Sequence, residues 1–261
     1  MSDVTLITFP PSLDSELARF LLHHYRVQHR EQRHTLIFSC FATVAHGFTP
    51  LFPLLYSDSY RLSPVRQIVD HFDPICPTER KLLPSNADRD KLEADWSLFN
   101  DTLAFASAIF AYYHLLPHKE IMVGPLSEGT PDFEVRAVEK AYPIFAGLLR
   151  VLLLLTPSRA EEALGRARKV MSEVDARIAD GRRYLVGNRF SLSDMAFAVA
   201  AAPLVLPDTY GGPLPSFDQM PGNVQAVIRE VRQQPAGQFA LRIYREYRTD
   251  AAVSVRKVAV A

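Results

Sequence analysis

Short extended runs and a helical pattern alternate along the first 73 residues. The run VTLITF at 4–9 is rich in β-branched residues and stops at two prolines, as a strand that enters a turn does. Apolar residues then recur at helical spacing in SELARFLLHHYRV. Further strands are predicted at 32–38, 54–56 and 60–62, and a helix with Ser63 as its N-cap and Pro64 in its first turn. The predicted order is β-α-β-(α)-β-β-α, one mixed sheet with helices on its faces.

Beyond residue 73 the pattern becomes helical. The proline-rich stretch DPICPTERKLLPSNAD indicates a linker. Helices are predicted after it at 87–116, 132–155, 158–178, 191–206, 223–232 and 235–247. The expected organisation is a mixed α/β domain over 1–73, a linker over 74–85, an all-helical domain over 86–250 and a tail over 251–261.

Two apolar runs of the second domain carry most of the prediction there. Ser191 and Asp194 stand three residues apart just before MAFAVAAAPLVL, which is a helix-capping pattern. Because that run is apolar on every side, its helix should lie at the centre of the domain and bend or end near Pro203. The run 144–155 contains Arg150 and is shorter than the roughly 18 residues of a membrane span, so it is interpreted as a core helix.

Composition and charge narrow the classes of partner. The chain has 261 residues, 48% of them hydrophobic, and 29 basic residues balance 29 acidic ones. No net charge is available to attract nucleic acid or an anionic membrane, so small molecules or proteins are the expected partners. The start MSDVTLITFPPS has no signal-peptide pattern, and Cys40 and Cys76 make no disulfide framework, which favours the cytoplasm. No H-E-x-x-H or paired C-x-x-C spacing occurs, so no metal site is predicted.

Two phrases of the sequence resemble a known family. YLVGNRFSLSDMAFA and LLPSNADRDKLEADWSLF are similar to yLvGd-fSlAD and LLP-dp-Ra-v--W, which are typical of cytosolic glutathione transferases. The resemblance covers nearly the whole chain and points to a Ser-type or an atypical, bacterial-like member. It implies a thioredoxin-like N-terminal domain that binds glutathione, an all-helical C-terminal domain, and a homodimer.

The glutathione site implied by the resemblance lies in FPLLYSDSYRLSPVRQIVDHF, which aligns without gaps on the family pattern vP-L-v-dG---l-ES-aI--yL. Pro53 then takes the family's cis-proline position, for which Pro50 competes only with an insertion. Pro64 and Val65 replace the acidic residue and serine that help to hold the γ-glutamyl end, and neither side chain supplies their hydrogen bonds. Ser63 and the backbone N–H groups at the helix start remain. The candidate glutathione-binding residues are Phe52, Pro53, Ser63, Val65 and Arg66.

The sulfur-stabilising position is the second site implied by the resemblance. TFPPSLDSELARFLLHHYRV is similar to the Ser-type pattern and puts Ser12 before the first helix, with Ser15 as the alternative. A hydrogen bond or a positive dipole there lowers the pKa of a thiol. Ser12 and Ser15 are therefore the candidate catalytic residues. An interpretation in which either serine only caps the helix remains open.

An apolar pocket for the second substrate is expected against this site. The family builds that pocket partly from the helix that here reads DWSLFNDTLAFASAIFAYYHLLPHKE. Aromatic residues crowd its second half and suit an apolar electrophile. The candidate lining residues are Phe110, Tyr113 and His114.

Two functions remain open at this point. The first is a glutathione transferase-like enzyme, with a detoxifying role, that activates the thiol of glutathione for attack on a small apolar electrophile. The second is a non-catalytic binding or interaction protein of the same fold that has lost normal glutathione binding. The second hypothesis follows from Pro64 and Val65, which replace the acidic residue and serine that hold glutathione in the family.

Overall fold

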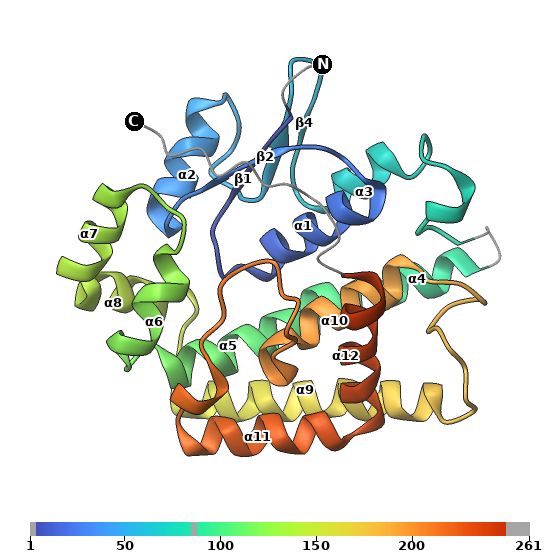
Figure 1. Cartoon of the computed structure of the whole chain (residues 1–261). Coiled ribbons are helices and arrows are strands. Elements are labelled where there is room, and N and C mark those ends of the chain that lie inside the picture. Colours follow the sequence, from blue (N-terminus) through green and yellow to red (C-terminus); the bar gives the residue numbers. More distant parts are fainter. Residues whose placement is uncertain (1–3, 85–87, 249–261) are drawn as a thin grey trace.

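The computed structural model describes residues 4–84 and 88–248. Figure 1 shows a small sheet domain above a larger group of helices, with α1 between the sheet and the helices. The predicted tail at 251–261 lies outside the described residues.

A four-stranded mixed sheet forms the core of the first domain. Its strands are β1 (Thr5–Thr8), β2 (Arg30–Arg33), β3 (Leu54–Tyr56) and β4 (Arg61–Leu62), in the order β2-β1-β3-β4. β1 pairs in parallel with β2, whereas β1 with β3 and β3 with β4 are antiparallel. The helices are α1 (Leu13–Tyr25), α2 (Leu36–Ala45) and α3 (Arg66–Phe72). Figure 1 shows α1 and α3 on one face of the sheet and α2 on the other.

The second strand differs from its prediction at 32–38. β2 is the polar run REQR, and Leu36 already begins α2. The strand was missed because its residues are charged or polar, among them Glu31, whose buried carboxylate pairs with Arg19 of α1. A prediction from hydrophobic positions therefore places the strand on the apolar residues that begin α2.

The start of α3 also differs from its prediction. The peptide bonds before Pro53 and before Pro64 are both cis, so the cis-proline expected at Pro53 is confirmed. The helix begins at Arg66, and Pro64 does not occupy its first position. The Ser63 side chain is buried and has no hydrogen-bond partner among the described residues, so the prediction that it caps α3 is wrong. The Ser63 backbone N–H instead donates to Gln67 Oε1 at 3.2 Å.

A long broken helix opens the second domain and lies against the others. The helical elements are η1 (Thr78–Arg80), α4 (Arg89–Trp96), η3 (Ser97–Leu103), α5 (Ala104–Leu115), α6 (Lys119–Ser127), α7 (Asp132–Lys140), α8 (Tyr142–Leu152), α9 (Pro157–Ile178), α10 (Leu192–Val205), η4 (Phe217–Gln219), α11 (Gly222–Gln233) and α12 (Pro235–Tyr247). The helix predicted at 87–116 is made by α4, η3 and α5, of which η3 is a π-helical segment.

The central helix predicted from its apolar sequence is α10. Every residue of α10 is buried except Pro203, and the helix packs on α5, α11, α12 and α1. The backbone N–H and the hydroxyl of Ser191 both donate to Asp194 Oδ2, at 2.8 and 2.7 Å. The predicted cap and the central position are both confirmed.

The helix predicted at 132–155 is two helices, and α6 was not predicted. Pro143 has no N–H to donate to the carbonyl of Glu139, which would be its partner in a continuous helix. Lys119 Nζ donates to that carbonyl instead, at 2.8 Å, and the chain turns between α7 and α8. The α6 sequence contains Gly124 and Pro125, which hid its helical pattern.

The apolar run at 144–155 is not a fully buried core helix, contrary to its interpretation from sequence. Phe145 and Leu149 of α8 are buried, but Ile144, Val151 and Leu152 are 76%, 69% and 61% exposed. Among the described residues, no single helix is long and apolar enough to cross a membrane. In the same described part of the chain, α8 and α9 taken together, bent by 61°, reach that length and apolarity.

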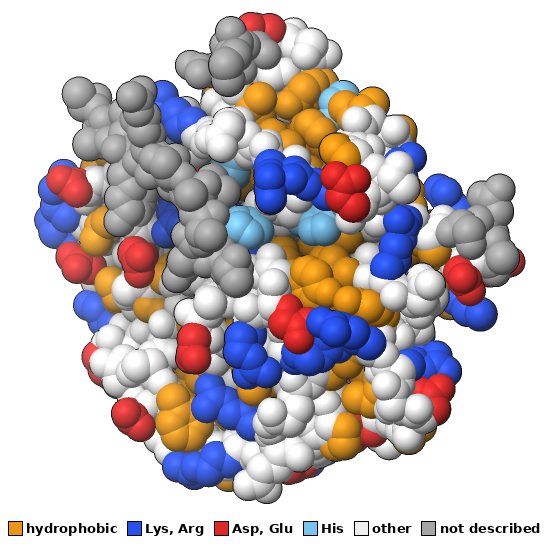
Figure 2. All heavy atoms as spheres, turned by 45° about the vertical axis from the view of Figure 1, so that its right-hand side comes forward, with side chains coloured by type: hydrophobic (Ala, Val, Ile, Leu, Met, Phe, Trp, Pro, Cys, Tyr) orange, Lys and Arg blue, Asp and Glu red, His pale blue; other side chains and the backbone are white. Residues whose placement is uncertain are grey.

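Hydrogen bonds across the linker fix the two domains to each other. The buried carboxylate of Asp73 accepts from the Leu82 N–H at 2.6 Å and from the Tyr25 hydroxyl at 3.0 Å. Arg66 of α3 forms a two-pronged ion pair with Glu93 of α4. Figure 2 shows positive and negative side chains interspersed on this side of the molecule, in keeping with the balanced charge.

Candidate active site between the domains

The N-terminus of α1 is the centre of the candidate site. β1 ends at Thr8, two prolines turn the chain, and Ser12 becomes the N-cap of α1. Ser12 Oγ accepts a hydrogen bond from the Ser15 N–H at 3.4 Å, so Ser12 does cap the helix. A hydroxyl also carries one proton to donate, so this cap leaves Ser12 able to donate to a ligand.

A cavity of about 560 Å³ lies beside Ser12, between the two domains. Its volume falls within the usual range for small-molecule sites. The first domain contributes the end of β1, the start of α1, Leu36 and Phe52, and the second contributes η3, α5 and the chain that follows α10. Most of the wall is apolar. Its polar side chains are Ser12, Asp14, Asn100, Asp101, Tyr112 and Tyr210.

Asp14 is a wall residue whose acidity is altered by its surroundings. Its side chain is accessible from the cavity, yet the surrounding protein atoms exclude much of its hydration. That loss of solvation, reinforced by the charge of Asp101, raises the pKa of Asp14 to about 6. Burial also raises the pKa of the Tyr112 hydroxyl. Burial raises the pKa of the Tyr210 hydroxyl as well, so both tyrosines of the wall are neutral at physiological pH.

The predicted glutathione-binding residues are only partly brought together. Phe52 lines the cavity and precedes the cis-bonded, buried Pro53. Ser63 and Val65 are buried away from the cavity wall, Val65 as part of the apolar core. Arg66 donates to Glu93 at 2.7 Å and lies over the Trp96 ring, so its charge is already paired.

Ser15, the alternative catalytic residue, lies outside the cavity. Its side chain is fully buried, and its hydroxyl has no hydrogen-bond partner within residues 4–84 and 88–248. Ser12 and Ser15 are three residues apart on one helical turn, but only Ser12 reaches the cavity wall. Of the two candidate serines, Ser12 is therefore the one that a ligand in the cavity would meet.

The predicted pocket residues of α5 lie off the cavity wall. Phe110 is buried in the core, and the ring nitrogen Nδ1 of His114 lies 3.0 Å from Asn223 Nδ2. Tyr113 is half-buried and does not line the cavity either. The helical period explains the difference, since the residues that do face the cavity recur three or four apart along α5. They are Ala104, Phe105, Ala108, Ala111, Tyr112 and Leu115.

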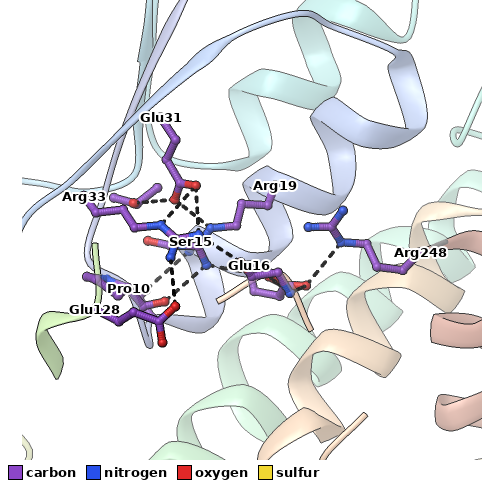
Figure 3. A network of polar contacts seen from close by, with 11 residues as sticks. Pro10, Ser15, Glu16, Arg19, Glu31, Arg33, Glu128 and Arg248 are labelled. Carbon is purple, nitrogen blue, oxygen red and sulfur yellow. Dashed lines mark hydrogen bonds and ion pairs between the residues drawn. The ribbon is translucent and has the colours of Figure 1, made fainter. Parts of the chain in front are cut away.

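A network of buried charges holds the other side of α1, and we call it the α1 charge network. Figure 3 shows its members, Glu16, Arg19, Glu31, Arg33 and Arg248, converging from both domains. Arg19 Nε donates to Glu31 Oε1 at 2.7 Å, and Arg19 Nη1 donates to the Pro10 carbonyl at 3.2 Å. The network thus fixes the turn that presents Ser12.

The electrostatics of the α1 charge network decide its protonation. Burial alone would raise the pKa of Glu31, but the charges of Arg19 and Arg33 and the hydrogen bond from Thr8 outweigh it. The pKa of Glu31 is lowered to about 2. The carboxylate therefore stays ionised at physiological pH, and both arginines remain paired.

Sequence reasoning missed Asp14 and the α1 charge network. Asp14 was hidden because an acidic residue in the first turn of a helix is an ordinary capping feature. Arg19 did carry a signal, since it interrupts the apolar run LARFLL on the face that must be buried. A buried arginine needs a carboxylate partner, and the polar strand REQR supplies one.

Comparison with known proteins supports the architecture. Residues 157–229 match the family model described as glutathione S-transferase, C-terminal domain. No curated protein sequence matches the chain.

Several solved structures share the fold across almost the whole chain. A glutathione S-transferase of Ceriporiopsis subvermispora in complex with glutathione is 12% identical, with a TM-score of 0.59 over 95% of this chain and 98% of that one. β-Etherase LigF from Sphingobium sp. strain SYK-6 is 14% identical, with a TM-score of 0.54 over 92% and 98%. Glutathione S-transferase III in its apo form is 15% identical, with a TM-score of 0.53 over 92% and 96%. The expected two-domain fold, thioredoxin-like and then all-helical, is therefore confirmed.

Proposed function

We propose that this chain is a glutathione transferase-like enzyme that holds a small, mostly apolar electrophile in the cavity between its domains. One observation carries the proposal: Ser12, at the N-terminus of α1, lies on the wall of a 560 Å³ apolar cavity that Phe52 also lines. The position that stabilises sulfur and the position that holds an apolar substrate are thus adjacent.

Ser12 would act on the thiol of glutathione. Its hydroxyl proton can donate to a sulfur atom, and the N-terminus of α1 adds a positive potential. Both effects favour the thiolate, which attacks the electrophile, forms the carbon–sulfur bond and expels the leaving group. The proton of the thiol goes to solvent.

Glutathione itself would be held in an unusual way. The buried Ser63 and Val65 and the paired Arg66 leave the first domain without the expected side-chain clamp. The backbone beside Phe52 and the N–H groups in the first turn of α1 are the groups near Ser12 that we expect to hold glutathione instead. We expect weak glutathione binding for this reason.

Calorimetric titration with glutathione tests the proposal, together with conjugation of a standard aromatic electrophile. We expect the Ser12→Ala substitution to lower kcat by about a hundredfold, as the loss of one donor to a developing anion does. Ser12→Thr keeps both the cap and the hydroxyl and serves as the matched control. Wild-type protein that neither binds millimolar glutathione nor conjugates the electrophile would overturn the proposal.

A second function is favoured by the same missing clamp. A non-catalytic protein of this fold would use the cavity to bind or carry a small molecule, without glutathione. The buried Val65 and the ion pair of Arg66 with Glu93 support this alternative. Ligand binding in the cavity with no glutathione binding would decide in its favour.

The resemblance also leads us to expect a homodimer in the cytoplasm, with a detoxifying role and no nucleic-acid or membrane partner. The solution mass, measured by light scattering, tests the first expectation. A mass near that of a single chain, 29.4 kDa, would contradict it.

A further inference from the structure

The cavity wall carries negative charge without any positive counterpart. Asp14 approaches it from α1 in the first domain, and Asp101 approaches it from η3 in the second. Among the described residues that line the cavity, none is a lysine, arginine or histidine. The charged side chains of the described wall are thus all acidic.

The two carboxylates are not neutralised by neighbours outside the wall either. Within the described part of the chain, Asp14 forms no ion pair, and Asp101 accepts a hydrogen bond only from Asn100 Nδ2, at 3.3 Å. Arg159 lies near the wall, with its guanidinium 5.6 Å from the centre of the Phe105 ring. It approaches the ring of Phe105 and pairs with neither carboxylate.

The charge of Asp14 comes at a free-energy cost that a ligand can repay. Its carboxylate is accessible from the cavity, but desolvation by nearby protein atoms and the charge of Asp101 raise its pKa. A cation placed between the two carboxylates would relieve their mutual repulsion and replace lost hydration. An anion in the same place would add to the repulsion.

We propose that the cavity takes an apolar, aromatic molecule that carries an ammonium group, with the ammonium between Asp14 and Asp101. The rings of Phe9, Phe105 and Tyr112 on the wall suit the apolar body and can also face a cation. This inference rests on the proposed function only in using the same cavity, and it narrows the electrophile to a cationic class.

The effect of pH follows from the acidity of Asp14. Asp101 is the charged group that acts on it, and the nearby Tyr112 and Tyr210 stay neutral. Below about pH 6, Asp14 gains a proton and loses its charge. The preference for a cation therefore grows between pH 5 and pH 8.

The test compares two probes of nearly equal shape, 4-phenylbenzylamine and 4-phenylbenzyl alcohol, by calorimetry without glutathione. At pH 8 we expect the amine to bind at least about tenfold more tightly than the alcohol, as one partly screened charge pair provides. At pH 5 the amine remains protonated, so a smaller preference there reports on Asp14.

Variants separate charge from shape. The double substitution Asp14→Asn and Asp101→Asn should abolish the preference for the amine while the alcohol binds as before, which also shows that the cavity is intact. Asp58→Asn, in the exposed β3–β4 turn, is the matched control and should change neither affinity.

Three results would overturn the inference: equal affinities for the two probes at pH 8, a preference that survives the double substitution, or no binding of either probe. Because glutathione is omitted, none of these results depends on conjugation. A failed conjugation assay with retained amine preference would instead reject the proposed function alone.

Discussion

Glu16 of α1 accepts hydrogen bonds from the backbone N–H of Gly211, at 3.0 Å to each carboxylate oxygen. The two residues belong to different domains and are 195 positions apart in the sequence. Glu16 is fully buried, so this contact holds the chain that follows α10 against the helix that carries Ser12. Ser12, at the start of α1, and Tyr210, next to Gly211, both lie on the cavity wall, so this contact joins two parts of that wall.

Gly212 should be intolerant of a side chain. A Cβ atom there would lie 2.6 Å from the Pro10 carbonyl oxygen and 2.8 Å from Arg19 Nη1. Both neighbours are fixed, so we expect Gly212→Ala to lower the free energy of unfolding by about 1–3 kcal/mol. Urea denaturation measures this change.

The matched control for this substitution is Gly165→Ala on the exposed side of α9, where a Cβ meets nothing within 4 Å. Replacing glycine inside a helix should raise the free energy of unfolding by about 1 kcal/mol. Equal effects of the two substitutions would show that a Cβ at position 212 fits beside the Pro10 carbonyl.

Loss of the Glu31 charge should destabilise the fold. Glu31→Gln leaves the buried guanidinium of Arg19 without its nearest carboxylate, and we expect a loss of about 3 kcal/mol at pH 7. The exposed Glu162, which pairs with Arg166, supplies the control. Glu162→Gln should change the free energy of unfolding by less than about 1 kcal/mol.

The stabilising effect of Glu31 should depend on pH. The pKa of Glu31 falls from an ordinary 4.5 to about 2 in the folded protein, so the unfolded chain takes up the proton first. The stabilising contribution is complete above pH 4.5 and is lost as the pH falls towards 2. The difference between wild type and Glu31→Gln should shrink over that window, and a constant difference would contradict the assignment.

Asp14 should lower stability at neutral pH. Its pKa is about 6 in the folded protein against an ordinary 3.8, so folding favours the protonated form. Stability therefore falls as the pH rises from about 4 to 6. We expect Asp14→Asn to raise the melting temperature at pH 8 and to change it little at pH 4. Thermal unfolding at both pH values measures this, and a lower melting temperature at pH 8 would oppose it.

The cap of α10 should contribute to stability through the Ser191 hydroxyl. Ser191→Ala removes the 2.7 Å hydrogen bond to Asp194, and we expect a loss of about 1 kcal/mol. Ser158→Ala is the control, because Ser158 lies exposed in the first turn of α9, whose cap is Thr156. Chemical denaturation of both variants should show a loss only for Ser191→Ala.

Local sequence patterns determined those helices and strands whose residues interact mainly with near neighbours in the sequence. The S-x-x-D pattern at Ser191 fixed the start of α10, and a run that is apolar on every side fixed its burial. The two-domain order was equally readable, because proline-rich and helical stretches differ in composition. These features depend on neighbours a few residues away, so they can be predicted without the tertiary structure.

Only the tertiary structure decided which side chains share the cavity. Ser12 reaches its wall whereas Ser15 does not, and Tyr112 rather than Tyr113 faces it. A rotation of about 100° per residue separates such neighbours, and no local pattern states which direction the partner domain will occupy. The facing of Asp14 and Asp101 arises in the same way. Both carboxylates are exposed, and they share one cavity wall only because the two domains pack against each other.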